Sequence, residues 1–278
     1  KKKNKEAGQL WRERFNKFRK NLHTKINNSH LSKNVYFVYA IDMLPKQLIL
    51  ITFMLFNSNS WAYNEADLIK LKTLNACKQC DLSGVDLSGV DLSGANLTDT
   101  DLSYANLSQT ILSEIDLTDA NLNGANLMDT SFIDAHLGNT YLAGVNLSRA
   151  NLSGVDFGDH DLTGANFTGA NLTDANLESA YLADTNFTDA ILVGVDLGGA
   201  DLSGSDLSHA DMSRANLRYA DLRKANLTGT ILRDSNLIGT NLAGANLATS
   251  DLKNAKLNGI RYCDTKMPWG EINEHCED

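Results

Sequence analysis

Residues 165–184 read ANFTGANLTDANLESAYLAD, which is four units of five residues built on one pattern. Each unit has a large apolar centre, preceded two residues earlier by a small residue. The residue just before the centre is usually Asn or Asp, and the one just after it is often Ser or Thr. Outward from this stretch, every position from 82 to 257 whose number ends in 2 or 7 is Leu, Phe or Met, giving 36 consecutive centres without an insertion.

A period of five fits neither the 3.6-residue turn of a helix nor the two-residue alternation of a strand. The chain must therefore turn at every unit, so that the centre and the small residue face an axis while the other three residues face water. Four sides close a coil of 20 residues, and the 36 units make nine coils. We predict a rod roughly 43 Å long, at about 4.8 Å between stacked strands.

The positions of proline and glycine support this arrangement. The two prolines, Pro45 and Pro268, both lie outside the repeats, where they cannot remove a donor from the ladder between coils. Of the 20 glycines, 15 fall two residues after a centre. A corner at that position needs a permissive backbone, which glycine provides.

The units Ala95-Asn96-Leu97, Ala165-Asn166-Phe167, Ala215-Asn216-Leu217 and Ala245-Asn246-Leu247 show the pattern undiluted. In this pattern the chain resembles the pentapeptide-repeat family over about two thirds of its length. The resemblance implies an all-β fold, a right-handed quadrilateral β-helix with the centre and the small residue inside. It names no activity, because most members have none assigned.

Both ends of the repeat region, residues 81–260, are expected to be capped, as a solenoid requires. At the N-terminal end, residues 63–80, Asn64 is expected to cap a short helix that covers the first coil with the apolar residues Leu68, Ile69, Leu71 and Leu74. At the C-terminal end, residues 261–278, the segment 262–270 and Cys276 resemble the terminal cap of secreted family members from photosynthetic bacteria.

The segment before the repeats is typical of targeting. Residues 43–62 combine Lys46, an apolar stretch over residues 48–56 and a small-x-small ending, so we predict a signal peptide cleaved after Ala62. An uncleaved membrane anchor is the alternative. Residues 1–42 are a basic leader of uncertain status: an untranslated or unstructured segment, an organelle transit sequence, or a membrane-surface helix.

Charge is divided along the chain. Residues 1–62 hold 12 Lys and Arg against 3 Asp and Glu, whereas residues 81–260 hold 8 basic and 24 acidic residues. Within the repeats, residues 81–213 contain 1 basic and 21 acidic residues, and residues 214–260 contain 7 basic and 3 acidic residues. An acidic rod repels phosphate, so we expect no direct nucleic-acid binding.

The four cysteines are disulfide candidates and not one metal site. Cys77 and Cys80 lie before the repeats and Cys263 and Cys276 after them, so nine coils separate the pairs. In an exported protein the second pair is most simply a disulfide of the cap. For Cys77 and Cys80 a structural link, two free thiols, a redox disulfide and half of a metal site all stay open.

The sequence offers little to catalysis. His136, His160 and His209 are isolated, and none belongs to a pattern that suggests a nucleophile. His160 takes the inward position normally given to a small residue, so we expect a buried, hydrogen-bonded ring that causes a local bulge. We predict no enzyme activity, no cofactor and no metal ligand, with the carboxylates as solvated faces.

Residues 20 apart form outward columns. The column from Asp86 is mostly Asn and predicts an amide ladder. Two other columns are predicted to form an interaction surface. Their residues are Tyr141, Tyr181, Asp161 and Asp201 in one column and Ile111, Ile191 and Ile231 in the other.

Two functional classes follow. The first is an exported, rigid structural or protein-interaction rod in the periplasm or thylakoid lumen, with an unknown protein partner and no stable membrane insertion unless the signal stays uncleaved. The second comes from the resemblance, since some family members mimic duplex DNA and bind DNA gyrase in the cytoplasm. The acidic repeats favour mimicry, whereas the export signal and the basic residues 214–260 oppose it. The charge gradient also suggests end-to-end association of rods.

Overall fold

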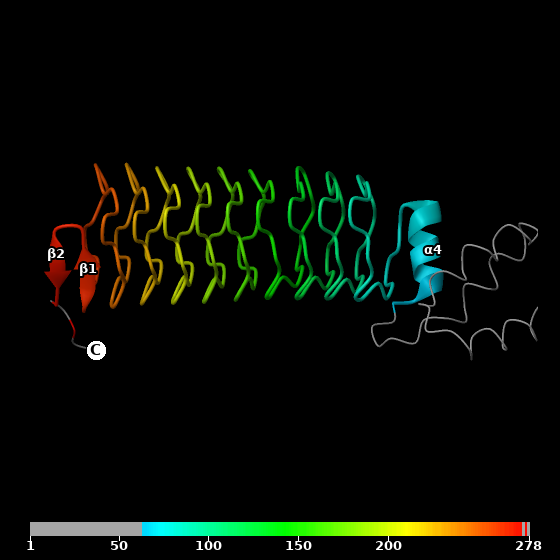
Figure 1. Ribbon diagram of the computed structural model, residues 1–278, viewed down its shortest axis with the longest axis horizontal. Coiled ribbons are helices and arrows are strands. Elements are labelled where there is room, and N and C mark those ends of the chain that lie inside the picture. The colour runs from blue at the N-terminus through cyan, green and yellow to red at the C-terminus, as the bar shows by residue number, and fades with distance from the viewer. Residues whose placement is uncertain (1–62, 274–275, 277–278) are drawn as a thin grey trace, which may run out of the picture. The chain divides into compact units, whose positions relative to one another are not determined.

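The computed structural model describes residues 63–273 and residue 276. The predicted signal peptide and the basic leader lie outside the described residues. The repeats form a row of stacked coils between helix α4 and a hairpin of strands β1 and β2 (Figure 1). Within the described part of the chain, no helix has the length and apolarity needed to cross a membrane.

The coils are joined by parallel bridges between residues 20 positions apart, from Ala76 with Asn96 to Asn246 with Lys266. Because each unit has five residues, this step closes a coil with four sides. Each bridge is a single residue pair, since most of a five-residue side is spent on the turn to the next one. The fold is therefore the predicted four-sided β-helix, but its sides are too short to count as continuous strands.

The backbone N–H groups of a regular unit have defined acceptors, as the unit from Asp81 shows. Leu82 N–H and Gly84 N–H donate forward to the carbonyls of Asp101 and Ser103, both at 2.8 Å, and Asp101 N–H donates back to the Cys80 carbonyl at 2.9 Å. Val85 N–H closes the turn onto the Leu82 carbonyl at 3.1 Å. Ser83 N–H donates to the Asp81 carboxylate at 3.1 Å. The side chain of the polar residue before a centre thus accepts the backbone N–H that the neighbouring coils leave without a partner.

The core contains the centres and the small residues, as predicted. Centres from Leu82 to Leu247 are buried, whereas Leu252 and Leu257 at the end of the repeat are only half-buried. The register also extends beyond residues 81–260. Cys77 and Met267 occupy buried centre positions, and Cys80 occupies the small inward position. The predicted boundaries are therefore too narrow by one unit or more at each end.

The corners have the left-handed backbone conformation that the positions of the glycines predict. All 15 glycines two residues after a centre have positive φ, for example 66° at Gly84. Many non-glycine residues share this conformation, including Asp99 at 56° and Tyr104 at 56°. Asp and Asn tolerate the left-handed region better than most residues, which explains their frequency at these corners.

Helix α4 spans Glu65–Leu74 and begins at Asn64, whose side chain accepts from Ala66 N–H at 3.0 Å. Leu71 is buried and Leu68 packs against the core. Ile69 and Leu74, however, are 47% and 67% exposed, so their predicted role in covering the first coil is wrong. The helix therefore contributes Leu68 and Leu71 to the core and leaves these two apolar side chains in contact with water.

At the other end, β1 (Thr265–Met267) pairs antiparallel with β2 (Gly270–Ile272). Met267 and Thr265 are buried, and the Thr265 hydroxyl donates to the Leu242 carbonyl at 2.8 Å. Trp269 lies on the turn of the hairpin and is 61% exposed. The side chains that reach the last coil therefore come from β1 and not from the tryptophan.

One junction between coils departs from the regular ladder. Among the described residues, the only bridges missing from the 20-residue series are His136 with Asp156 and Tyr141 with Asp161. His160 lies between Asp156 and Asp161 in sequence, at the inward position where Ala is the commonest residue. We expected a buried ring, but His160 is half-buried. Its Nε2 lies 2.7 Å from the Leu137 carbonyl oxygen and its Nδ1 lies 2.9 Å from that of Gly158. The predicted bulge is present as this two-bridge opening.

Candidate interaction surfaces

The four sides of the rod differ in their outward residues, and we name each side by its composition. Each is defined by the column of bridge residues just before its centres. The tyrosine face starts at Asp81, the amide face at Asp86, the isoleucine face at Asp91 and the glycine face at Asn96, each continuing in steps of 20 residues. Side chains in one column are held in register by the ladder beneath them.

The tyrosine face holds four of the predicted surface residues. Tyr141 and Tyr181 are 60% and 56% exposed, Asp161 is exposed and Asp201 is half-buried. Bridges join Asp161 to Tyr181 and Tyr181 to Asp201. Tyr141 shares the column but is separated from Asp161 by the opening at His160. The structure thus brings three of these residues into one unbroken ladder and leaves Tyr141 beyond the break.

The isoleucine face is less apolar than predicted. Ile111 and Ile191 are 48% and 45% exposed, but Ile231 is half-buried. The bridges place Asp211 between Ile191 and Ile231, so these isoleucines do not form a continuous patch. Ile133, also 48% exposed, lies one coil from Ile111 and was missed because it follows its centre.

Two further exposed tyrosines were missed because they occupy corners. Tyr104 and Tyr219 are 61% and 65% exposed and have positive φ. Each ring lies against the next coil: a Cβ added at Gly124 would meet the Tyr104 ring at 2.6 Å, and one added at Gly239 would meet the Tyr219 ring at 2.5 Å. A corner tyrosine followed 20 residues later by glycine is the sequence signal that identifies both.

The predicted amide ladder forms on the amide face. Asn106, Asn126 and Asn146 each donate from Nδ2 to the side-chain oxygen one coil earlier, at 3.0, 3.2 and 2.9 Å. Asn166 continues the series onto Asn146 at 3.2 Å. This face is rigid and nearly neutral over these coils.

Aspartates before centres are fixed as anions by their own turns. Hydrogen bonds from the Ser93 hydroxyl, at 2.6 Å, and from its N–H, at 3.0 Å, lower the pKa of Asp91. At a corner of the amide face, hydrogen bonds from the Arg149 guanidinium lower the pKa of Asp129. Lowered pKa values keep the acidic faces charged at neutral pH.

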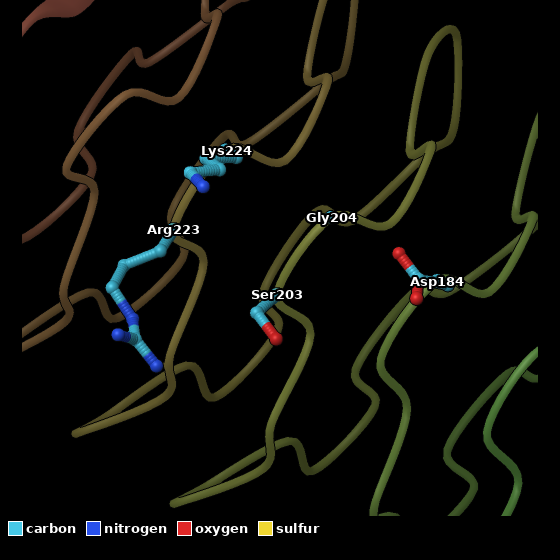
Figure 2. A pocket seen from close by; sticks show the side chains of 5 residues that line it. All are labelled: Asp184, Ser203, Gly204, Arg223 and Lys224. Carbon is cyan, nitrogen blue, oxygen red and sulfur yellow. The ribbon is translucent and has the colours of Figure 1, made fainter.

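A shallow depression of about 280 Å³ lies on the tyrosine face where the charge changes sign. Figure 2 shows Asp184 on one side, Arg223 and Lys224 on the other, and Ser203 and Gly204 on the coil between them. Arg223 pairs with Asp221 at 2.6 Å, so its charge is already matched. The lining holds the Ser203 hydroxyl but no histidine, so it lacks the serine–histidine pair that commonly activates such a nucleophile.

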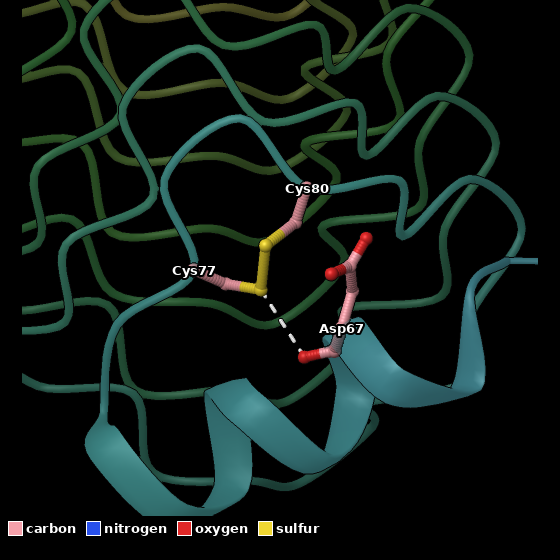
Figure 3. A group of neighbouring side chains, drawn as sticks. All are labelled: Asp67, Cys77 and Cys80. Atoms are coloured by element: carbon pink, nitrogen blue, oxygen red, sulfur yellow. Dashed lines mark hydrogen bonds between the residues drawn. A yellow bond between two sulfur atoms is a disulfide. The ribbon is translucent and has the colours of Figure 1, made fainter.

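The cysteines pair at opposite ends of the described chain. Cys77 is bonded to Cys80, and Cys263 is bonded to Cys276. Figure 3 shows the first pair beside Asp67 of α4, with Cys77 Sγ 3.1 Å from the Asp67 carbonyl oxygen. Lys70 Nζ lies 3.5 Å from Cys80 Sγ. Both sulfurs belong to buried residues and are bonded to each other, so they offer no thiolate to a metal in this state.

Comparison with known proteins agrees with the fold. The family model described as pentapeptide repeats matches in overlapping copies from residue 80 to residue 261. A search among curated proteins returned no match.

Among solved structures, the chain is similar to HetL, a pentapeptide repeat protein involved in heterocyst differentiation regulation from the cyanobacterium Nostoc sp. strain PCC 7120. Identity is 27%, the TM-score is 0.37, and 76% of this chain and 100% of HetL are covered. A pentapeptide repeat protein from the thylakoid lumen of Arabidopsis thaliana is 29% identical, with a TM-score of 0.17 and coverage of 40% of this chain and 67% of that one. Full-length QnrB1, a plasmid-mediated fluoroquinolone resistance protein, is 18% identical, with a TM-score of 0.43 and coverage of 68% and 94%.

Proposed function

The chain belongs to the pentapeptide-repeat family, and from this membership we propose that it is an exported, non-catalytic rod that binds a protein partner through its outer faces. Pentapeptide-repeat proteins are generally non-catalytic structural or interaction proteins. The observation that carries the proposal is the tyrosine face, where Tyr181 is held between Asp161 and Asp201 by the ladder. An exposed tyrosine on a fixed backbone gives contact area at low entropic cost, which suits a protein interface.

Export is supported by two features. Residues 43–62 have the composition of a signal peptide, and all four cysteines are paired as disulfides, the form favoured in oxidising compartments. Both features support our proposal that the mature protein lies in the periplasm or a thylakoid lumen, with cleavage after Ala62.

A second candidate is an acidic mimic of duplex DNA in the cytoplasm. The charge of residues 81–213, with 21 acidic residues against 1 basic residue, favours it. The reversal of charge over residues 214–260 counts against it, because phosphate charge on duplex DNA is uniform along the helix.

The test is the mature N-terminus, the compartment and the thiol state of the native protein, measured by fractionation and intact-mass analysis with and without reductant. The proposal expects a chain that begins at Tyr63, in an exported compartment, with two disulfides. A cytoplasmic, reduced protein that keeps its leader would instead favour the DNA mimic. In an exported protein, loss of partner capture in Tyr181→Ala but not in Asn166→Ala would assign the contact to the tyrosine face.

A further inference from the structure

The glycine face differs from the other three in shape. On this face, the residue just after the centre is glycine in three units, at Gly138, Gly158 and Gly198. Among the described residues of the coils, these are the only glycines that do not lie at a left-handed corner. A Cβ at Gly198 would lie 3.2 Å from Asn216 Nδ2 and from Asp196 Oδ1, and Gly158 is crowded in the same way. The middle of this face is therefore flat at these three coils, with Glu178 raised between Gly158 and Gly198. Further along, the same position holds Arg218, Ile238 and Asn258 and is raised.

The charge of the glycine face divides at the same place. Six carboxylates on its acidic coils take part in none of the ion pairs found among the described residues: Asp116, Asp119, Asp156, Asp159, Glu178 and Asp196. After Asp196 this face has no acidic residue, and its two cations are Arg218 and Lys256, which are also outside those ion pairs. On the other faces of the same coils, two of the five cations are in ion pairs, Arg223 with Asp221 and Arg233 with Asp251.

The charged groups are held in place. Asp196 Oδ1 accepts from Gly198 N–H at 2.9 Å and from Asn216 Nδ2 at 2.7 Å, which leaves Oδ2 for an outside donor. Arg218 lies against the Tyr219 ring, with its guanidinium carbon 5.2 Å from the ring centroid. Ordered side chains lose little entropy on pairing, and Arg and Tyr are enriched in interfaces.

We propose that the glycine face is the contact between two copies of this chain, packed face to face and antiparallel about a two-fold axis that lies in the contact plane and runs across the rods. Coils are evenly spaced, so one axis placed between Gly198 and Arg218 sets several pairs at once. Arg218 meets Gly198 of the second copy, Ile238 meets Glu178, and Asn258 meets Gly158. Raised positions thus meet mostly flat ones, and the contact is self-complementary, as an isologous dimer requires.

The same rotation keeps the two edges of the face in place. Lys256, which precedes its centre, is brought to Asp156 of the second copy, which also precedes its centre and is exposed. Arg218, opposite Gly198 of the second copy, lies beside Asp196, two residues away in the same unit. The two cations of these coils therefore meet carboxylates, and this pairing favours the second copy over a partner of uniform charge. The contact spans about six coils, or roughly 29 Å at 4.8 Å per coil, which is a small interface that salt should weaken.

The first experiment measures the self-association of the full chain by sedimentation equilibrium at low and high ionic strength. We expect a dimer that dissociates in high salt, and dimer affinity reduced by roughly tenfold or more in either Arg218→Glu or Asp196→Arg. The double variant carries the swapped pair and should recover most of the affinity. Arg214→Glu, an equal charge change on the isoleucine face, is the matched control and should leave the affinity within a few fold of the parent.

The second experiment identifies the contact directly. A mixture of ¹⁴N and ¹⁵N protein is treated with a carbodiimide, which joins only amines and carboxylates already in contact. Lys256 and Asp156 lie five coils apart in one chain, roughly 24 Å at 4.8 Å per coil, so a bond between them must join two copies. A peptide with one light and one heavy partner is the expected product. A monomer at low salt and high concentration, an Arg214→Glu effect equal to that of Arg218→Glu, or no mixed Lys256 peptide would overturn the proposal.

Discussion

The coils after Asp161 and the junction just before it have the same five-residue pattern, but they differ in the backbone bridges that join neighbouring coils. From Asp161 to Asp251 every bridge of the series is present, whereas two are missing between the coil of His136 and the next. The centres flanking the opening, Phe157 and Leu162, are still buried. Burial of the centres therefore maintains the register, and the backbone ladder can be lost locally without losing the coil.

The size of the inward side chain explains the difference. In regular coils several inward threonines reach the carbonyl 23 residues earlier, as Thr230 does to Leu207 at 2.8 Å and Thr240 to Leu217 at 2.7 Å, whereas others bond to the carbonyl three residues earlier. His160 reaches the equivalent carbonyl of Leu137 with a ring instead of a hydroxyl. The ring needs more room between coils than a hydroxyl does. Both its nitrogens face carbonyl oxygens, so a neutral ring can donate to only one of them.

The largest effect is expected where the ladder is intact and the core is tightest. Phe167 is fully buried and stacks on Phe187, with centroids 4.7 Å apart and planes 3° apart. Phe167→Asp would bury a carboxylate without a partner and should lower the free energy of unfolding by about 4 kcal/mol or more. Denaturant titration measures this loss. Phe167→Leu, the commonest centre, is the control and should cost less than about 1.5 kcal/mol.

Thr140→His should copy the junction one coil earlier. Thr140 is buried, and its hydroxyl lies 2.9 Å from the Leu117 carbonyl oxygen and 2.7 Å from that of Leu137. A ring here should separate the bridges of Asp116 with His136 and Asn121 with Tyr141, at a cost of about 1 to 3 kcal/mol. Hydrogen exchange should show faster exchange at the amides of those bridges only. Faster exchange throughout the rod would mean that an inward ring cannot be contained locally.

His160→Thr should do the reverse. The hydroxyl can reach Leu137 as other inward threonines reach their carbonyls, and the two coils can close. We expect the missing bridges to form and stability to rise by about 1 kcal/mol. Exchange at the amides of Leu137, Leu142, Asp156 and Asp161 should slow to the rate of Leu177, Leu182, Asp196 and Asp201, their equivalents two coils later. Unchanged exchange would show that His160 is not what holds the coils apart.

Much of the contrast between the regular coils and the junction at His160 could be predicted from sequence. The inward position of His160, the glycine corners and the amide ladder all follow from residue type at fixed phase, and the structure confirms each. The phase itself also places Cys77 and Met267 at centres, but Cys is not a typical centre residue, and Tyr262 interrupts the series of Leu, Phe and Met before Met267. Pairing across coils was harder to predict. The packing of Tyr219 over Gly239 depends on two residues 20 apart, not on either residue alone.

Acid should destabilise the coils before the junction at His160 more than the coils after it. The described aspartates with lowered pKa values are Asp86, Asp91, Asp116 and Asp129 before the junction and Asp206 and Asp251 after it. Their folded pKa lies below the unfolded value, so they stabilise the fold above the unfolded pKa, near 3.9, and this contribution is lost as pH falls through the folded pKa. Exchange measured below pH 4 should therefore rise first in the coils before Asp156.

Asp86→Asn tests the cause of this acid effect. The amide keeps an oxygen for Ser88 N–H, which donates to Asp86 Oδ1 at 3.1 Å, but it no longer titrates. The difference in stability between neutral pH and pH 3 should shrink slightly, because Asp86 is exposed and only one of several such groups. A larger acid sensitivity in this variant would contradict the sign of its pKa shift.

The smallest effect is expected at an outward residue of an intact ladder. Asn166 accepts from Thr168 N–H at 3.0 Å and donates to Asn146 at 3.2 Å, so it is more engaged than an ordinary surface residue. Ser in its place keeps an acceptor for the turn but loses the amide donor, and Asn166→Ser should cost about 0.5 to 1 kcal/mol. Denaturant titration beside Phe167→Asp compares adjacent residues that differ only in facing water or the axis. Equal losses at the two positions would refute the inward and outward register on which both regions of the rod are built.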